Sequence, residues 1–232
     1  MPEKRFHTIL LDADGTLFDF VKAERTAIKN TSFRFGIEVS EEDVNLYNRI
    51  NNMCWMKLER GEITREELFT ERFSLWFSHI GASVDPLCFH SVYENNLSMC
   101  GFLYEGVYEF LKALKESYRL ILVTNGSAKV QRGRLKESGI SSYFSNIYIS
   151  EEIGLKKPDA EFFDYVMNDA GIEDRSGVVI FGDSLSSDMQ GGRNAGIATC
   201  KYSPDGRVGN SELCDHEAES FENFLNILDI SL

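Results

Sequence analysis

Five short apolar segments, spread unevenly along this 232-residue chain, predict a parallel β-sheet. Each segment is apolar or β-branched and is followed by a polar loop and a helical pattern. This βαβα order is typical of a sheet that helices cover on both faces. The segments are Phe6–Leu11, Arg119–Thr124, Ile147–Ser150, Val178–Phe181 and Ile197–Lys201. The sequence therefore predicts an α/β fold with a mostly parallel sheet flanked by helices.

The chain between the first two segments has a different pattern. Residues 20–100 contain no convincing strand and predict four helices. Ser40 and Thr64 each begin a capping-box pattern, and Asp85 precedes a proline as helix N-caps do. Apolar residues recur at spacings of three and four in one predicted helix: Leu68, Phe69, Phe73, Trp76, Phe77 and Ile80. We therefore expect an all-helical cap domain, residues 18–104, inserted after the first strand of an α/β core of residues 1–17 and 105–232.

The last part of the chain is polar and contains glycine between Ser203 and Ser220. This composition predicts a surface loop. An apolar pattern at Phe221–Leu228 then predicts a final helix.

The composition excludes several classes of partner. The formal net charge of −13 would repel a nucleic-acid backbone, so we expect no nucleic-acid ligand. No apolar run approaches the roughly 18 residues of a membrane span, and the apolar stretch before Asp12 is too short for a signal peptide. The five cysteines form no C-x-x-C pair, which favours reduced thiols. We therefore expect a cytoplasmic protein with no membrane partner.

Polar residues follow four of the predicted strands. They are Asp12-x-Asp14-Gly15-Thr16, Thr124-Asn125-Gly126, Lys156-Lys157-Pro158, and Gly182-Asp183-Ser184 with Asp188. Each group alone is typical of an ordinary turn or helix start. Ligand sites of open α/β sheets lie beyond the carboxyl ends of the strands, where these four groups should meet. Their conjunction predicts one functional site.

The residue types of this predicted site suit phosphoryl transfer. Clustered carboxylates without cysteine or paired histidine favour Mg²⁺, which prefers oxygen ligands. An aspartate can serve as the nucleophile, and a second carboxyl group can move the proton. An acidic protein needs local positive charge to bind a phosphate ester, and a metal, a lysine and backbone N–H groups supply it. We therefore expect a small phosphorylated metabolite as the partner.

These four motifs, in this order, resemble those of the haloacid dehalogenase superfamily of phosphohydrolases. The resemblance implies a Rossmann-like core with a helical cap inserted between the first two motifs. It implies that Asp12 is the nucleophile and Asp14 the general acid and base. Thr124 would bind the phosphoryl group, and Lys157 would stabilise its charge. Of the two adjacent lysines we choose Lys157 over Lys156, because Lys157 adjoins the proline of the motif.

The same resemblance implies the remaining ligands of the site. Mg²⁺ would lie on Asp12, the backbone carbonyl of Asp14 and Asp183, with Asp188 near the ion or bound through water. The phosphate would be held by the residues of the second and third motifs: Thr124, Asn125, Gly126 and Lys157.

A narrower resemblance involves the predicted helical domain. Asn51-x-x-x-Trp55, Gly61-x-Ile63 and Arg72-Phe73-x-x-Trp76 look like the cap of the bacterial pyrimidine 5′-nucleotidase family. This implies hydrolysis of nucleoside 5′-monophosphates, with a preference for pyrimidines. Four residues are candidates for contacting the substrate beyond its phosphate: Phe18, Phe20, Asn51 and Trp55. Each has an ordinary alternative, since the aromatic rings could be core and Asn51 could cap a backbone group.

The sequence leaves other activities of the superfamily to be weighed. A phosphomutase of the β-phosphoglucomutase type, or a phosphatase for a sugar phosphate, would use the same core residues. A dehalogenase is disfavoured because that group typically lacks the second aspartate, which is Asp14 here. Phosphonate hydrolysis would want a Schiff-base lysine in the cap, where Lys57 lies, although a solvated helix residue is the simpler reading of Lys57.

Overall fold

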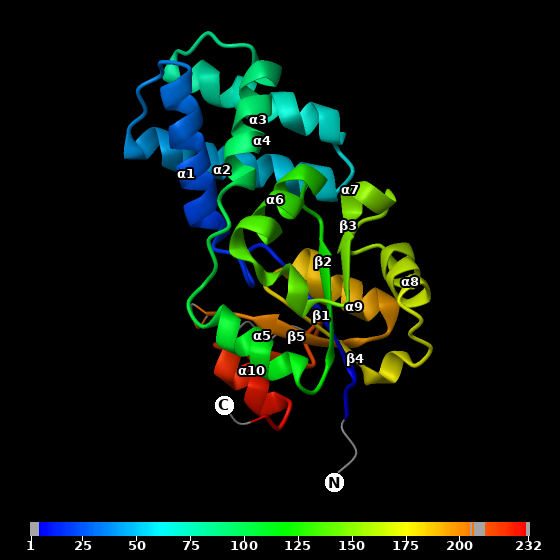
Figure 1. Cartoon of the computed structure of the whole chain (residues 1–232). Coiled ribbons are helices and arrows are strands. Elements are labelled where there is room, and N and C mark those ends of the chain that lie inside the picture. The colour runs from blue at the N-terminus through cyan, green and yellow to red at the C-terminus, as the bar shows by residue number, and fades with distance from the viewer. Residues whose placement is uncertain (1–4, 205, 207–211, 231–232) are drawn as a thin grey trace. The chain divides into compact units, whose positions relative to one another are not determined.

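The computed structural model describes residues 5–204, 206 and 212–230 (Figure 1). The chain divides into two compact units. An α/β unit contains Met1–Asp19, Leu103–Gln131 and Ser138–Leu232, and a helical unit contains Phe20–Phe102 and Arg132–Glu137. Helix α6 (Ala128–Ser138) therefore contributes residues to both units.

Among the described residues, six strands form one sheet in which every neighbouring pair is parallel. The strands are β1 (Thr8–Leu11), β2 (Arg119–Thr124), β3 (Asn146–Ile149), β4 (Val178–Gly182), β5 (Ala198–Tyr202) and β6 (His216–Ala218). Their order is β3-β2-β1-β4-β5-β6. The chain runs outward from β1 to β3 and then returns to the other side of β1, so the order reverses between β1 and β4. Ligand sites of such sheets lie at this reversal. The predicted α/β fold is confirmed.

Helices cover both faces of the sheet (Figure 1). On one face, α8 (Ala160–Asp169) packs Phe162, Phe163, Val166 and Met167 against strand residues such as Leu10 and Ile180. On the other face lie α5 (Val107–Lys115) and α10 (Phe221–Ile227), and the rings of Phe181 and Phe224 stack there at 4.2 Å. Because both faces are buried, the central strands β1, β2 and β4 are mostly apolar.

Short elements connect the strands of the α/β unit. The α-helical ones are α7 (Ser150–Ile153) and α9 (Gln190–Ala195). Two 3₁₀ turns, η1 (Ile140–Tyr143) and η2 (Arg175–Gly177), and one π-helical turn, η3 (Leu185–Met189), complete them. The π-helical turn directly follows the end of β4, and such turns often occur at functional sites.

Residues 20–102, all of them described, form the four helices that the sequence predicts. They are α1 (Phe20–Arg34), α2 (Glu41–Glu59), α3 (Arg65–Ile80) and α4 (Pro86–Ser98). Ser40 and Thr64 each complete a capping box, and the Asp85 carboxylate accepts the backbone N–H of Cys88 at 2.9 Å. These caps satisfy N–H groups that a helix start leaves without intrahelical partners.

Aromatic side chains form the interior of the helical unit. Trp76 is fully buried, its ring lies 5.4 Å from that of Tyr47, and its Nε1–H donates to the carbonyl of Asp43 at 2.8 Å. The ring of Phe73 stacks on that of Tyr47, with the ring centroids 5.5 Å apart. The prediction that Trp76 belongs to the apolar face of its helix is confirmed.

The C-terminal part differs from the prediction. Strand β6 lies inside the segment Ser203–Ser220, which the sequence predicts as a loop, and it pairs with β5 through Cys200 and His216. Residues 205 and 207–211 of that segment lie outside the described residues. A strand of three residues that includes a histidine and a glutamate has no apolar pattern of its own, so only its pairing reveals it. The final helix is confirmed, ending one residue earlier.

None of the described helices has both the length and the apolar character that crossing a membrane requires.

Candidate active site

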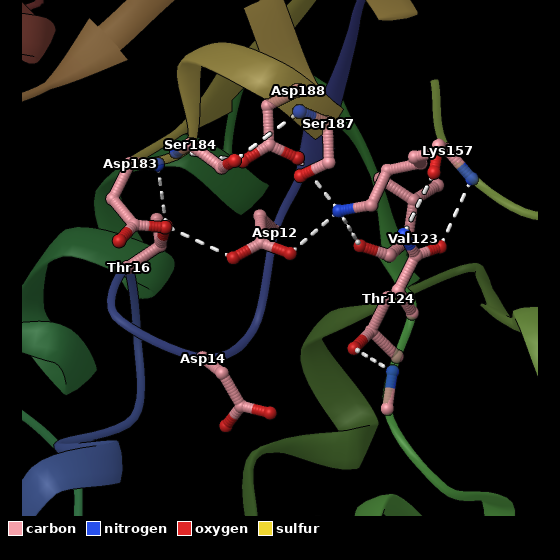
Figure 2. A network of polar contacts seen from close by, with 12 residues as sticks. Asp12, Asp14, Thr16, Val123, Thr124, Lys157, Asp183, Ser184, Ser187 and Asp188 are labelled. Atoms are coloured by element: carbon pink, nitrogen blue, oxygen red, sulfur yellow. Dashed lines mark hydrogen bonds and ion pairs between the residues drawn. The ribbon is translucent and has the colours of Figure 1, made fainter. Parts of the chain in front are cut away.

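Three carboxylates converge at the carboxyl edge of the sheet. Asp12 follows β1, Asp183 follows β4, and Asp188 lies on the π-helical turn η3 (Figure 2). The backbone N–H of Asp12 donates to Phe181 O at 3.0 Å, which extends the pairing of β1 with β4 by one residue. One oxygen from each carboxylate lies within 4.8 Å of the others. The reversal in strand order thus places three negative charges together.

Lys157 is the positive charge at this edge. Its side chain is 1% exposed, and Nζ donates to Asp12 Oδ1 at 2.6 Å, Asp188 Oδ1 at 2.6 Å and Val123 O at 3.0 Å (Figure 2). Burial lowers the pKa of Lys157, but the charges of Asp12 and Asp188 outweigh that effect and raise it. The lysine therefore stays an ammonium ion with all three donors used.

The backbone of Lys157 is held by Asn125. The Asn125 amide donates to Lys157 O at 2.8 Å and accepts from Lys157 N at 2.9 Å. We expected Asn125 among the phosphate-binding residues. In the structure its side chain holds the backbone of Lys157. Thr124 is almost fully buried, and its Oγ1 accepts the N–H of Gly126 at 3.2 Å. The hydroxyl proton of Thr124 can still be donated to an anion.

Thr16 connects Asp12 to the end of β4. Its hydroxyl donates to Asp12 Oδ2 at 3.1 Å and accepts the backbone N–H of Asp183 at 3.1 Å (Figure 2). Both oxygens of Asp12 are therefore fixed, one by Lys157 and the other by Thr16. Thr16 belongs to the first motif at the predicted site, but the sequence alone indicated no role for its side chain.

The electrostatics of the three carboxylates fit a divalent cation. Burial, followed by the charge of Asp188, raises the pKa of Asp12 well above its usual value, against the opposing effect of Lys157. Asp183 is exposed as a whole residue, but its carboxylate is surrounded largely by protein atoms that displace solvent. That displacement and the charge of Asp188 raise the pKa of Asp183 to about 7. One lysine does not balance three clustered carboxylates, and an all-oxygen donor set suits a hard cation such as Mg²⁺.

Gly15 makes the approach of Asp183 possible. Its φ is 83°, a left-handed conformation that glycine adopts without strain. A Cβ atom at this position would lie 2.4 Å from Asp183 Oδ2. The glycine of the first motif is therefore required by both backbone conformation and space.

Asp14 points in a different direction from the other carboxylates. In Figure 2 its side chain extends away from the group formed by Asp12, Asp183 and Asp188. Its Oδ2 accepts from Gln131 Nε2 at 2.5 Å. The carboxylate of Asp14 is therefore not part of the acidic cluster. Gln131 lies on α6, and sequence reasoning had no signal for it because its partner is 117 residues away.

Two of the four substrate-contact candidates are buried inside their own units. Phe18 is fully buried and forms an isolated β-bridge with Leu103. Asn51 is also fully buried, where its amide donates to Glu24 Oε1 at 2.6 Å and accepts from Arg72 Nη1 at 2.9 Å. The burial of both side chains does not fit the expectation that Phe18 and Asn51 touch a substrate.

The other two candidates are partly accessible. Phe20 begins α1, and the guanidinium of Arg134 lies 5.6 Å from its ring centroid. Trp55 is half-buried on α2, with the guanidinium of Arg65 5.8 Å from its ring. Both rings belong to the helical unit.

Lys57 does not have the environment of a Schiff-base lysine. Its Nζ forms an ion pair with Glu71 at 2.5 Å. The hydrogen bond to Glu71 raises the pKa of Lys57. A Schiff base forms from the neutral amine, which this partner disfavours.

Comparison with known proteins places these features in a family context. A model of the haloacid dehalogenase-like hydrolase family matches residues 6–196. The pyrimidine 5′-nucleotidase PynA of Streptococcus pneumoniae is 34% identical over 95% of this chain and 94% of PynA. The pyrimidine 5′-nucleotidase YjjG of Escherichia coli is 33% identical over 83% of this chain and 84% of YjjG.

A solved structure agrees with this one over nearly its whole length. The HAD-hydrolase YfnB of Bacillus subtilis is 32% identical over 98% of this chain and 97% of YfnB. Its magnesium-bound crystal structure, described as revealing interdomain movement, matches 98% of this chain and 100% of that chain with a TM-score of 0.93.

Proposed function

We infer the function of this chain from its family: it belongs to the haloacid dehalogenase-like hydrolase family. We propose that it is a Mg²⁺-dependent phosphomonoesterase that forms an aspartyl-phosphate on Asp12 and hydrolyses nucleoside 5′-monophosphates, preferentially those of pyrimidines. The observation that carries this proposal is the separation of two aspartates. Asp12 is held by Lys157 within the acidic cluster, and Asp14 is held apart from it by Gln131.

The arrangement supports a reaction in two steps. Asp12 attacks the phosphorus, the bond from phosphorus to the ester oxygen breaks, and Asp14 gives its proton to the departing alcohol. Water then attacks the phosphorus, Asp14 takes its proton, and the bond to Asp12 breaks to release inorganic phosphate. In both steps Asp14 moves the proton and Asp12 carries the phosphoryl group.

Other residues of the site have supporting roles in the proposal. Lys157 and the Thr124 hydroxyl would stabilise negative charge on the phosphoryl oxygens, and Thr16 would orient Asp12. When bound, Mg²⁺ would be held by the carboxylates of Asp12, Asp183 and Asp188 and by the backbone carbonyl of Asp14, and it would neutralise phosphoryl charge. The magnesium-bound structure of YfnB supports this ion.

The substrate class rests on the relatives PynA and YjjG, both named pyrimidine 5′-nucleotidases and both matched over more than four-fifths of the chain. Phe20 and Trp55 are the remaining aromatic candidates for contacting a base. A small phosphorylated metabolite as substrate, together with five free cysteines, supports a cytoplasmic location.

A phosphate-release assay tests the proposal. Pyrimidine and purine nucleoside 5′-monophosphates and a hexose phosphate are compared, each with Mg²⁺ and with a chelator. We expect Mg²⁺-dependent release that is fastest from pyrimidine nucleotides. Equal rates in chelator would refute the metal requirement, and faster release from the hexose phosphate would refute the substrate class.

The nucleophile is tested by Asp12→Asn, because an amide does not form the acyl-phosphate. We expect a loss of at least about 10³-fold in turnover. Asp164→Asn is the matched control, since Asp164 is half-exposed and pairs with Arg175 away from the acidic cluster. Full activity in Asp12→Asn would contradict the covalent mechanism.

A further inference from the structure

We propose that Gln131 is a positioning residue that fixes which oxygen of Asp14 carries the transferred proton. This role rests on the proposed function, in which Asp14 is the general acid and base. The structural basis is the hydrogen bond from Gln131 Nε2 to Asp14 Oδ2 at 2.5 Å.

Gln131 is held in place by its backbone and by its surroundings. It lies in the first turn of α6, where its N–H donates to Ser127 O at 2.9 Å, and its side chain is fully buried. Gly126 provides the space for its amide. A Cβ atom at Gly126 would lie 2.3 Å from Gln131 Nε2 and 2.9 Å from Cδ. Because Gly126 has no side chain, the amide of Gln131 can pass beside it and reach Asp14.

The orientation of the amide follows from the chemistry of its partner. An ionised carboxylate only accepts hydrogen bonds, so the NH₂ group of Gln131 must face Asp14. The other end of the amide, Oε1, is buried and has no hydrogen-bond partner among the described residues. A buried acceptor without a partner costs stability. A methionine of similar length would fill this space without that cost, so packing alone does not account for a glutamine here.

The hydrogen bond has a consequence for proton transfer. In a protonated carboxyl group the carbonyl oxygen accepts hydrogen bonds better than the hydroxyl oxygen does. The N–H of Gln131 on Oδ2 therefore favours the proton of Asp14 on Oδ1. Oδ1 would give that proton to the departing ester oxygen and would later take a proton from the attacking water. Because Oδ2 accepts from Gln131 in both protonation states, the carboxyl group keeps one orientation through both steps.

This role predicts a dependence on the leaving group. The alcohol of a nucleoside 5′-monophosphate leaves as a strong base and needs the proton of Asp14, whereas p-nitrophenolate leaves as a weak base and needs little protonation. The value of kcat/KM reports the steps up to formation of the aspartyl-phosphate. We expect Gln131→Met to lower kcat/KM by about 10- to 100-fold for the nucleotide and by less than about 3-fold for p-nitrophenyl phosphate.

Two further variants complete the experiment. Gln131→Leu is also apolar and removes the donor to Asp14, so we expect the same selective loss. Lys136→Met is the matched control, because Lys136 is exposed on the same helix, and we expect both substrates to be unaffected. Thermal unfolding of all variants reports whether they are folded at the assay temperature.

The outcomes separate the two proposals. An equal loss for both substrates in Gln131→Met and Gln131→Leu would show a purely structural role and overturn the inference. Unchanged kinetics in these variants would overturn it as well. Absence of phosphate release by the wild type from either substrate would overturn the proposed function, and the role of Gln131 with it.

Discussion

Replacing Lys157 with methionine should destabilise the metal-free protein by about 3–5 kcal/mol near pH 8, because it leaves buried carboxylates without their cation. Lys157 is 1% exposed and bridges Asp12 and Asp188, each at 2.6 Å. Methionine has an unbranched chain of similar length and can fill the same space. The change therefore isolates the charge and its hydrogen bonds.

The magnitude follows from the contacts that are lost. Hydrogen bonds to charged groups are worth about 1.5–3 kcal/mol each, and Lys157 makes two of them to carboxylates. A third bond, to Val123 O at 3.0 Å, is of the weaker kind made to a neutral group. Protonation of one carboxylate in the variant recovers part of the loss, so the net effect stays within the range measured for breaking a buried ion pair.

The loss should depend on pH in a definite direction. In the wild type, burial and Asp188 raise the pKa of Asp12, while Lys157 opposes them. Without Lys157 the pKa of Asp12 rises further. A raised pKa in the folded state favours folding below the unfolded pKa, and that advantage is lost as the pH rises through the folded pKa. Destabilisation by Lys157→Met should therefore grow from pH 5 to pH 8, by up to about 1.4 kcal/mol per pH unit for each proton involved.

Urea unfolding in the presence of a chelator measures this effect. Both tryptophans, Trp55 and Trp76, lie in the helical unit, so their fluorescence is complemented by far-ultraviolet circular dichroism, to which both units contribute. Lys57→Met is the matched control, since Lys57 pairs with Glu71 at the surface and should contribute far less. An equal loss in both variants, or a loss at pH 5 as large as at pH 8, would refute the reasoning.

The remaining predictions concern space, packing and metal affinity. Gly15→Ala should lower phosphate release by about 100-fold, because a Cβ would lie 2.4 Å from Asp183 Oδ2, whereas Gly36→Ala, with open space around it, should keep turnover. Trp76→Ala should lower the free energy of unfolding in urea by about 3–5 kcal/mol, since Trp76 is fully buried. Half-buried Trp55→Ala should cost less than about 1 kcal/mol but raise KM for nucleotides. Mg²⁺ affinity, measured by calorimetry, should be weaker at pH 6 than at pH 8. The pKa of Asp183 is raised to about 7, so at pH 6 protons compete with Mg²⁺ for its carboxylate. Equal affinity at the two pH values would contradict this.

Much of the fold could be predicted because its signals are local. The strand β2 has the predicted bounds, Arg119–Thr124, since four consecutive apolar residues, two of them β-branched, lie between Arg119 and Thr124. Ser40 and Thr64 begin their helices where the capping boxes are visible in four residues of sequence. Strand β6 was missed because three residues ending in Glu217 and Ala218 become a strand only through pairing with β5.

The site was predictable only in outline. The sequence placed Asp12 and Asp183 at the ends of two strands on one edge of the sheet, because parallel strands present their carboxyl ends at the same edge. It had no means of finding Gln131, which reaches Asp14 from a helix 117 residues further along the chain. It also proposed Asn51 for the substrate, whereas the structure buries that amide among interior polar groups.

The sequence by itself determined most of the succession of strands and helices along the chain, and it determined the motifs at the strand ends. Hydrophobic periodicity, caps and turns are encoded within a few residues. The tertiary structure decided which polar atoms meet. It brought Lys157 to Asp12 across 145 residues and used Thr16 to connect Asp12 with Asp183. Such contacts depend on how distant segments pack, because a hydrogen bond extends only about 3 Å and is set by geometry rather than by composition.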